Sequence, residues 1–458
     1  MKLDPSSQEF RSAGHRLVDW IADYLDNIDS RRVLSNVQPG EIAQQFASGP
    51  SANGKSYDEL FAEFESKILP GITHWNHPSF FAYFSITGSQ AGILGEMLSA
   101  ALNTNGMLWK TSPAVTELET VALRWLRDSL GLPSNLFGII NDTASINSFL
   151  ALAAGREAMG LNVRREGLAD LPQFRIYCSE HAHSSIDKAA LALGFGARGI
   201  VKIPSDDAFR MRPDALEKAV AADRAEGMLP CAVVATVGTT STASVDPVRA
   251  IAHIAEREHM WLHVDASYAG SATIDPSFRW LWDGIEGADS IVVNPHKWLF
   301  TQVDCSVLYT RKPEVLRETF SLVPEYLKTT DTAEVNYMDY GLQLGRRFRA
   351  LKLWLVLEHY GIERLRTVIR DHVEFAKRLA AELENRDDIE LLAPQSMSVV
   401  VFRKKGSEEE NAALLERLNA SGKIFVSHTK LRDRYGIRVA IGNGATEWRH
   451  VQQILHLI

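Results

Sequence analysis

Cysteine is scarce in this chain of 458 residues: only Cys178, Cys231 and Cys305 are present, and no CxxC pair exists. An odd number of widely spaced cysteines gives no sign of a disulfide framework, and the missing CxxC spacing gives none of a zinc site. We therefore predict a location in the cytoplasm.

Long apolar runs and an excess of positive charge are missing too. No stretch approaches the roughly 18 apolar residues of a membrane span, and MKLDPSSQEF at the start lacks the apolar core of a signal peptide. The formal net charge of -8 provides no general attraction to nucleic acid or to an anionic membrane. The sequence thus predicts neither partner.

The overall composition is ordinary for a globular protein, with 45% hydrophobic and 23% charged residues. Its length suggests about three domains, some of which a large α/β fold can merge. Arg346, Arg347 and Arg349 form a local basic cluster, which we interpret as a solvated helix face or an ion-pair network.

The first periodic segment is amphipathic. Apolar residues recur at helical spacing and predict a helix over residues 8–27: Phe10, Ala13, Leu17, Trp20, Ile21, Tyr24 and Leu25. This helix has no neighbouring partner in the sequence, so we expect it to pack on a distant part of the fold or on a second subunit.

From about residue 136 the chain alternates between short apolar runs and helical patterns. The runs predict strands at 136–140, 174–178, 199–203, 231–237, 260–264, 290–293 and 305–310. Such alternation indicates an α/β fold, a mainly parallel sheet with helices on both faces. Ligands of these sheets gather at the carboxyl ends of the strands.

The last hundred residues predict a smaller α+β unit. Residues 341–384 are mostly helical in pattern, and strand patterns at 398–405, 423–427 and 436–442 follow, with helical 410–420 between the first two. We predict three domains: an N-terminal helical segment, 1–85; a large domain, 86–355; and a small C-terminal α+β domain, 356–458.

Reactive side chains follow several of the predicted strands. Thr143, Ala144 and Ser145 open a helix after the first strand, where backbone N–H groups could hold a phosphate or simply be capped. The later strand ends deliver His181 and His183, the Thr239–Thr240 turn, Asp265, and finally Asn294 to Lys297. Five adjacent strand ends with such groups indicate a ligand site.

Three kinds of site were weighed. A dinucleotide site at GFGARG (194–199) is rejected, because the glycines precede a strand instead of following one. A metal site built from His181, His183, His263 and Asp265 stays open as an alternative. A lysine bonded to pyridoxal phosphate is favoured, since Lys297, the Asp265 carboxylate and a phosphate seat are all present.

Several long motifs resemble a known family. They are HWNHP (74–78), SPAVTELE (112–119), DTAS (142–145), AHSS (182–185), HVDASYAG (263–270), NPHKW (294–298) and LGRRFRALKLW (344–354). In this order they resemble the group II pyridoxal-phosphate decarboxylases, and above all the aromatic-L-amino-acid decarboxylases. The resemblance runs from about residue 8 to the last helix.

The resemblance implies a fold-type I enzyme with a seven-stranded sheet and pyridoxal 5'-phosphate as cofactor. Lys297 would form the Schiff base, Asp265 would pair with the pyridinium nitrogen, and His183 would stack on the ring. It also implies a cofactor shell of Thr143, Ala144, Ser145, Asn294 and His296, with Thr240 and Ser267 close to the ring.

Tyr326 matches the tyrosine that supplies a proton after carbon dioxide leaves. Relatives that form aldehydes tend to carry phenylalanine there, or asparagine in place of the stacking histidine. Because Tyr326 and His183 are both present, the resemblance implies simple decarboxylation to an amine. An aldehyde synthase, a decarboxylase of non-aromatic amino acids and a non-catalytic scaffold remain alternatives.

The family's aromatic substrate pocket is matched by Trp75, Tyr83 and Phe84. Gly345 stands where plant members carry glycine for indole substrates and serine for phenolic ones. Three positions depart from the usual residues of the family: Ile86, Asn105 and Met107. The implied substrates are tryptophan, 5-hydroxytryptophan, dopa, tyrosine or phenylalanine.

Family members are homodimers whose N-terminal helices clasp the partner. The resemblance therefore implies a homodimer with active sites at the interface, where Asn105 and Met107 reach the neighbour's site.

Overall fold

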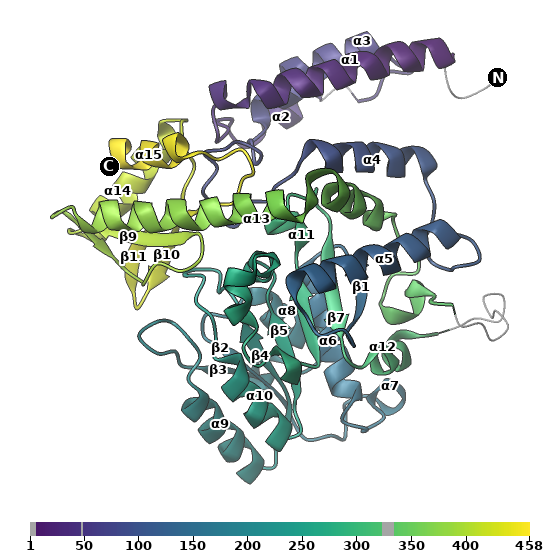
Figure 1. Ribbon diagram of the computed structural model, residues 1–458, viewed down its shortest axis with the longest axis vertical. Helices are drawn as coiled ribbons and strands as arrows, with labels where there is room; N and C mark the ends of the chain where they lie inside the picture. The colour runs from purple at the N-terminus through teal and green to yellow at the C-terminus, as the bar shows by residue number, and fades with distance from the viewer. Residues whose placement is uncertain (1–5, 47–48, 323–333) are drawn as a thin grey trace.

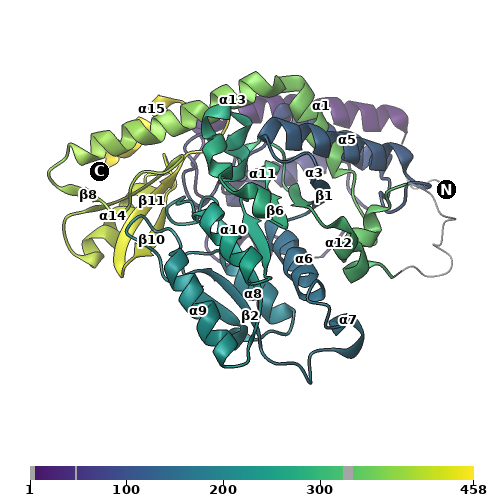
Figure 2. The ribbon, with the colours of Figure 1, turned by 60° about the horizontal axis from the view of Figure 1, so that its bottom comes forward.

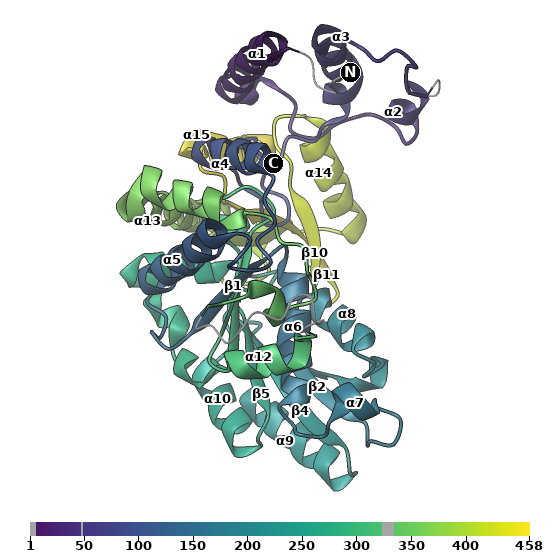
Figure 3. The ribbon, with the colours of Figure 1, turned by 90° about the vertical axis from the view of Figure 1, so that its right-hand side faces the viewer.

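The computed structural model describes residues 6–46, 49–322 and 334–458 (Figure 1). Its N-terminal helices α1 (Ser7–Asp26), α2 (Glu41–Gln44) and α3 (Tyr57–Glu63) stand at one end of the molecule (Figure 3). The predicted helix over 8–27 is confirmed as α1, which begins at a capping box between Ser6 and Glu9. Trp20 of α1 packs edge-on against Phe64, 5.3 Å between ring centroids, so the helix has a partner within its own segment.

The centre of the molecule is a seven-stranded sheet in the order β1-β7-β6-β5-β4-β2-β3. Only β7 runs antiparallel to its neighbours, so the predicted mainly parallel sheet is confirmed. The strands are β1 (Phe137–Asn141), β2 (Phe174–Ser179), β3 (Ile200–Ile203), β4 (Leu229–Thr236), β5 (Trp261–Asp265), β6 (Ser290–Val293) and β7 (Ser306–Thr310).

The strands are mostly apolar because helices bury both faces of the sheet. Val234 packs on the face of α6 and α8, whereas Val233 and Val264 belong to the core under α5, α9 and α10. Figure 3 shows α5 and α10 on one side of the sheet and α6 and α8 on the other.

The remaining helices of the large unit connect or cover these strands. They are α4 (Gln90–Leu102), α5 (Pro113–Leu130), α6 (Ala144–Glu157), α7 (Val163–Glu166), α8 (Ser184–Ala192), α9 (Pro213–Ala225), α10 (Val248–Arg257), α11 (Pro295–Trp298) and α12 (Pro313–Phe320). None of the helices within the described ranges is both long and apolar enough to cross a membrane.

The C-terminal unit packs beside the large sheet (Figure 2). Helix α13 (Arg349–Glu384), interrupted at Gly361 with φ +67°, leads into it and runs across the predicted boundary at residues 355 and 356. An antiparallel sheet in the order β10-β11-β9-β8 follows. Its members and helices are β8 (Ile389–Leu391), β9 (Val399–Lys404), α14 (Glu408–Ala420), β10 (Ser427–Leu431), β11 (Arg434–Ala440) and α15 (Trp448–Leu457).

Two predictions for this end of the chain were wrong in detail. The helix expected from residue 341 begins at Arg349. The strand expected at 423–427 is displaced, and β10 begins only at Ser427, because the preceding residues bind the N-terminal segment instead. There the Phe425 carbonyl accepts from the Phe81 N–H at 2.8 Å.

Candidate functional site

Lys297 lies on α11, directly after the carboxyl end of β6. Burial lowers the pKa of its amine, nearby Arg438 lowers it further, and only Asp265 opposes the shift. The Lys297 Nζ lies 5.4 Å from the centroid of the Phe84 ring. Because a deprotonated amine is nucleophilic, this environment suits a lysine that forms a covalent bond to a carbonyl compound.

Asp265 ends the neighbouring strand β5 and accepts a hydrogen bond from the Ser267 N–H at 3.1 Å, with the Ser267 hydroxyl also bound. His263, two residues earlier, points to the same face of the sheet. Its Nε2 lies 3.2 Å from the Ser148 hydroxyl on α6 and its Nδ1 lies 2.9 Å from that of Ser290. These contacts hold the strand rigid below the carboxylate.

His183 caps the N-terminus of α8, the helix that follows β2. Its Nδ1 accepts from the Ser185 N–H at 3.1 Å. Burial and then the charge of Lys297 lower the pKa of this imidazole. The ring is therefore neutral at pH 7 and, with Nδ1 acting as acceptor, carries its proton on Nε2.

Helix α6 begins at the end of β1 and offers a seat for a phosphate. Its N-cap residue Thr143 makes no side-chain capping bond, which leaves the first-turn N–H groups of Ala144 and Ser145 without a partner inside the helix. The hydroxyl-bearing residues Thr143 and Ser145 are exposed at this end. Free N–H groups at a helix N-terminus bind phosphate readily.

A chain of buried amides links this seat to the lysine. Asn141 donates to Asn147 at 2.7 Å, Asn147 donates to the Ser306 hydroxyl at 2.7 Å, and that hydroxyl binds Asn294. The chain fixes β1, α6, β7 and the turn before Lys297 relative to one another.

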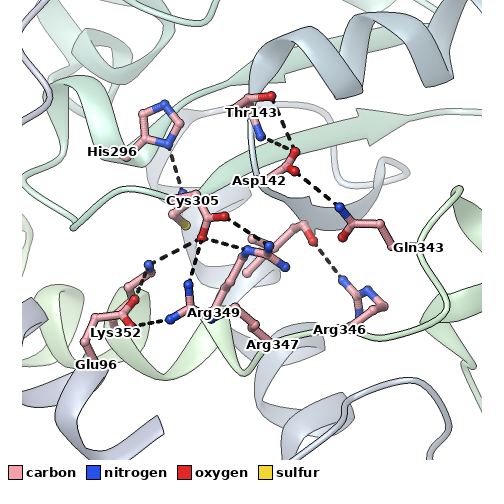
Figure 4. Close-up of polar contacts among 12 residues, drawn as sticks. Glu96, Asp142, Thr143, His296, Cys305, Gln343, Arg346, Arg347, Arg349 and Lys352 are labelled. Carbon is pink, nitrogen blue, oxygen red and sulfur yellow. Dashed lines mark hydrogen bonds and ion pairs between the residues drawn. The ribbon is translucent and has the colours of Figure 1, made fainter. Parts of the chain in front are cut away.

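His296, next to the lysine, faces inward. Its Nδ1 accepts from the Cys305 N–H at 2.9 Å (Figure 4). Burial, then Lys297, lowers the pKa of this imidazole to about 3, so the ring is neutral.

A buried ionic cluster supports the loop that carries Cys305. Asp304 receives two hydrogen bonds from Arg349, at 3.0 and 3.1 Å, and lies 3.9 Å from Lys352 (Figure 4). Lys352, 1% exposed, also pairs with Glu96 on α4. Burial would raise the pKa of the Asp304 carboxyl, but the Arg349 hydrogen bonds bring it below the usual value.

The predicted basic cluster is largely an ion-pair network. Arg346 is buried and pairs with Glu119 at 2.6 Å, while its backbone N–H donates to Asn105 at 2.9 Å. Arg347, by contrast, is exposed and pairs with Glu96.

One residue of the site was missed in the sequence. Arg438, on β11, is buried, and its guanidinium lies 4.5 Å from the centroid of the Phe84 ring. Its Nη1 donates to the Tyr83 carbonyl at 2.5 Å, but Nε and Nη2 have no hydrogen-bond partner among the described residues. Burial lowers the pKa of this guanidinium to about 10, which leaves it charged at neutral pH. The only sequence signal was one arginine in the otherwise apolar run predicted at 436–442, where an unpaired charge is costly.

The four residues of the alternative metal site have separate hydrogen-bond partners. His181 Nε2 faces the Ser205 hydroxyl at 3.2 Å, whereas His183 and His263 bind other serines. Within residues 6–46, 49–322 and 334–458, no group of three metal-binding side chains is present.

A comparison with family models matches residues 39–405 to the pyridoxal-dependent decarboxylase conserved domain. The chain belongs to this family. The decarboxylase is 40% identical to tyrosine decarboxylase 4 of Petroselinum crispum over 98% of this chain and 92% of that protein. It is 38% identical to phenylacetaldehyde synthase of a Rosa hybrid cultivar, over 100% of this chain and 94% of the relative.

A solved structure supports the same family assignment. The crystal structure of Oryza sativa TDC with PLP and tryptamine superposes with a TM-score of 0.96 at 38% identity, covering 100% of this chain and 98% of that one. The predictions of an α/β fold, a pyridoxal-phosphate enzyme and a decarboxylase are therefore confirmed.

The side chains of the decarboxylase fit its cofactor, pyridoxal phosphate. The free N–H groups of α6 match the phosphate, the carboxylate of Asp265 matches the ring nitrogen, and the amine of Lys297 matches the aldehyde. Ser267 belongs to the cofactor site because its N–H donates to the Asp265 carboxylate. Thr240, by contrast, is exposed in the turn after β4.

The predicted substrate residues divide into three groups. Phe84 stacks on Tyr268, 3.7 Å between centroids, and lies beside Lys297. Trp75 and Tyr83 stack on each other at 5.9 Å and are partly exposed, and Ile86 is half-buried.

The third group lies at the surface on other elements. Asn105 is the nearest side chain to Gly345, where an added Cβ would come within 3.9 Å of its amide nitrogen. Met107 lies beside Met338, whose N–H donates to the Met107 carbonyl at 3.3 Å. Among the described residues, none of these three makes a hydrogen bond with Lys297. Tyr326 lies outside the described residues.

Proposed function

We propose that this pyridoxal-phosphate-dependent carboxy-lyase acts on an aromatic L-amino acid and releases the arylalkylamine and carbon dioxide. The proposal rests on the observation that the Phe84 ring centroid lies 5.4 Å from the amine of Lys297 and 4.5 Å from the guanidinium of Arg438. An aromatic wall beside an anchoring amine and a free anion donor suits an amino acid with an aromatic side chain.

The chemistry divides between cofactor and protein. When bound, pyridoxal phosphate supplies an electron-accepting ring for the electron pair left by departing carbon dioxide. Lys297 would hold the cofactor through its amine, and Asp265 would pair with the ring nitrogen. His183 is neutral and carries its proton on Nε2. It can therefore donate a hydrogen bond to a group bound at the α8 side of the site.

Arg438 orients the substrate in this proposal. Its unpartnered Nε and Nη2 groups can bind the substrate carboxylate, since guanidinium groups bind carboxylates in a paired geometry. Tyr326 then returns a proton to the α-carbon, and this role rests on the family resemblance alone.

The experiment is product analysis by mass spectrometry. The cofactor-loaded enzyme receives tryptophan, 5-hydroxytryptophan, tyrosine, dihydroxyphenylalanine and phenylalanine together, with Lys297→Ala as the control. Amines from one or more of these substrates, absent from the control, support the proposal. Aldehydes instead of amines would favour the activity named for the Rosa relative, and no product would refute an aromatic substrate.

We further propose a homodimer with active sites at the interface, in which Asn105, Met107 and Gly345 reach the partner's site. Supporting it, apolar side chains stand exposed on two helices: Phe10, Leu17 and Val18 on α1, and Leu94, Met97, Leu98 and Leu102 on α4. Light scattering tests this, because a fully active monomer would contradict it.

The free, buried thiols of the three cysteines are compatible with the proposed cytoplasmic location.

A further inference from the structure

A second cavity, of about 500 Å³, lies where the N-terminal segment meets the C-terminal unit. Its walls come from residues 29–32, His77 and Ser79, the turn at 421–423 and helix α15. None of its lining residues belongs to the cofactor site. In Figure 1, α15 lies beside the chain that follows α1.

The cavity carries an excess of positive charge. Arg31, Arg32 and Lys423 line it and make no ion pair with any carboxylate in the described part of the chain. The single acidic lining residue, Asp29, is already shared by Arg449 at 2.8 Å and His450 at 3.1 Å. Three cations therefore line this space without an ion-pair partner, and the guanidinium of one of them, Arg31, lies 5.3 Å from the centroid of the Tyr24 ring.

Two buried polar groups on the cavity wall also lack partners. Ser79 is fully buried and its Oγ has no hydrogen bond, and the same holds for Nε2 of His77, which is 3% exposed. The His77 Nδ1 accepts from the Ser79 N–H at 2.9 Å, so the neutral ring carries a proton on Nε2. Buried polar groups are nearly always hydrogen-bonded, so the unused Ser79 hydroxyl is available to an acceptor in the cavity, whereas His77 has the backbone of Asp29 beside it.

We propose that this cavity binds a phosphate dianion, either inorganic phosphate or the phosphate group of a small monoester. Arg31, Arg32 and Lys423 would neutralise its charge, and the Ser79 hydroxyl would donate to one of its oxygens. The cavity is larger than one phosphate group and leaves room for the body of a monoester.

Such a ligand would tie the N-terminal segment to the C-terminal unit. The two parts already meet here through the Val33 N–H and the Gly422 carbonyl, 2.9 Å apart. Arg32 lies across this glycine, where an added Cβ would clash with its guanidinium, and donates to the Ala420 carbonyl at 3.2 Å. Because the anion binds only the folded arrangement, it would raise the melting temperature, and the rise would grow with the logarithm of anion concentration above the Kd.

Calorimetric titration of the holoenzyme tests the proposal. The holoenzyme is freed of unbound pyridoxal phosphate on a desalting column, so that the bound cofactor keeps the phosphate seat of α6 occupied and no free monoester competes. Sodium chloride at equal ionic strength provides the baseline. Inorganic phosphate is titrated in one arm and glycerol 3-phosphate in the other. We expect one saturable site per chain, and the tighter of the two ligands tells whether free phosphate or a monoester is preferred.

Three variants and one control locate the site. Arg32→Gln and Lys423→Gln should each weaken binding about tenfold, since each removes a charge-assisted contact. Ser79→Ala should weaken binding without a change in net charge, whereas Lys218→Gln, on exposed α9, should not. Decarboxylase activity verifies that each variant is folded. Because Lys423 is exposed, its replacement removes a charge from the cavity without disturbing the core. Absence of saturable binding, or equal binding by all four variants, would overturn the proposal.

Discussion

At the residue scale, the chemistry depends on where single charges are placed. Lys297 would be an ordinary ammonium group in water. Burial and the neighbouring charge of Arg438 lower the pKa of its amine, and Asp265 limits the shift. Arg438 itself keeps two unused donors close to the Phe84 ring. Each of these residues acquires its role from the others.

Replacement of Arg438 by methionine tests its role in substrate binding. We expect KM for the amino acid to rise by about tenfold or more, because a charged contact to the carboxylate is lost. The absorbance of the bound cofactor should persist. Arg434→Met, on the same strand but at the surface, is the control, and an unchanged KM in Arg438→Met would rule the role out.

Replacement of Tyr326 by phenylalanine tests the proton donor. Without its hydroxyl we expect products to shift from amine toward aldehyde, which mass spectrometry of the reaction mixture measures. Tyr435→Phe, in the C-terminal unit, should leave the ratio unchanged. An unaltered amine yield in Tyr326→Phe would refute the assignment.

At the element scale, strand ends and a buried ionic cluster set the geometry. The parallel strands β2, β4, β5 and β6 end at one edge, and antiparallel β7 begins there. The loop before β7 is held by Asp304, whose partners Arg349 and Lys352 come from α13, far along the chain. Buried pairs of this kind are costly to break because the remaining charges stay buried.

Replacement of Asp304 by alanine should therefore destabilise the protein strongly. We expect a loss of about 3 kcal/mol in the free energy of unfolding and weaker retention of the cofactor, since buried Arg349 loses its counter-charge and Lys352 keeps only Glu96. Urea unfolding and the absorbance of the bound cofactor measure these effects. The exposed pair of Asp214 with Arg212 gives the control, and Asp214→Ala should change stability by less than about 0.5 kcal/mol. Equal effects of both changes would contradict this account of the cluster.

At the scale of the whole molecule, the fold buries several neutral histidines. Burial lowers the pKa of His263, His372 and His77 to about 4, and that of His296 to about 3. In the unfolded chain these rings titrate near pH 6.5. Between about pH 4 and 6.5 the unfolded state therefore binds more protons than the native state.

Stability should consequently fall as the pH drops from 7 toward 4. At pH 5 we expect these four histidines to take up about 3.6 protons on unfolding, measurable as the slope of unfolding free energy against pH. His372→Gln should reduce this uptake by about one proton, while His456→Gln, at an exposed site, should not. A slope of zero, or proton release, would show that these rings are charged in the native state.

Local patterns in the sequence determined much of this protein. Unbroken apolar runs predicted the seven strands because both faces of the sheet are covered, and helical periodicity predicted α1. The motifs around His183, Asp265 and Lys297 predicted the family and the cofactor, since these residues follow strand ends that meet at one edge. Such features need only neighbouring residues to be recognised.

Other features were decided only by the tertiary structure. The strand expected at 423–427 begins only at Ser427, because the Phe425 carbonyl accepts a hydrogen bond from the Phe81 N–H. No local pattern in the sequence connects these two residues. Arg438 joined the site because β11 carries it to Phe84, and the cationic cavity exists only where residues 29–32 meet the C-terminal unit. Contacts between distant parts of the chain, and the pKa shifts that burial causes, depend on the packed fold and leave no local signal in the sequence.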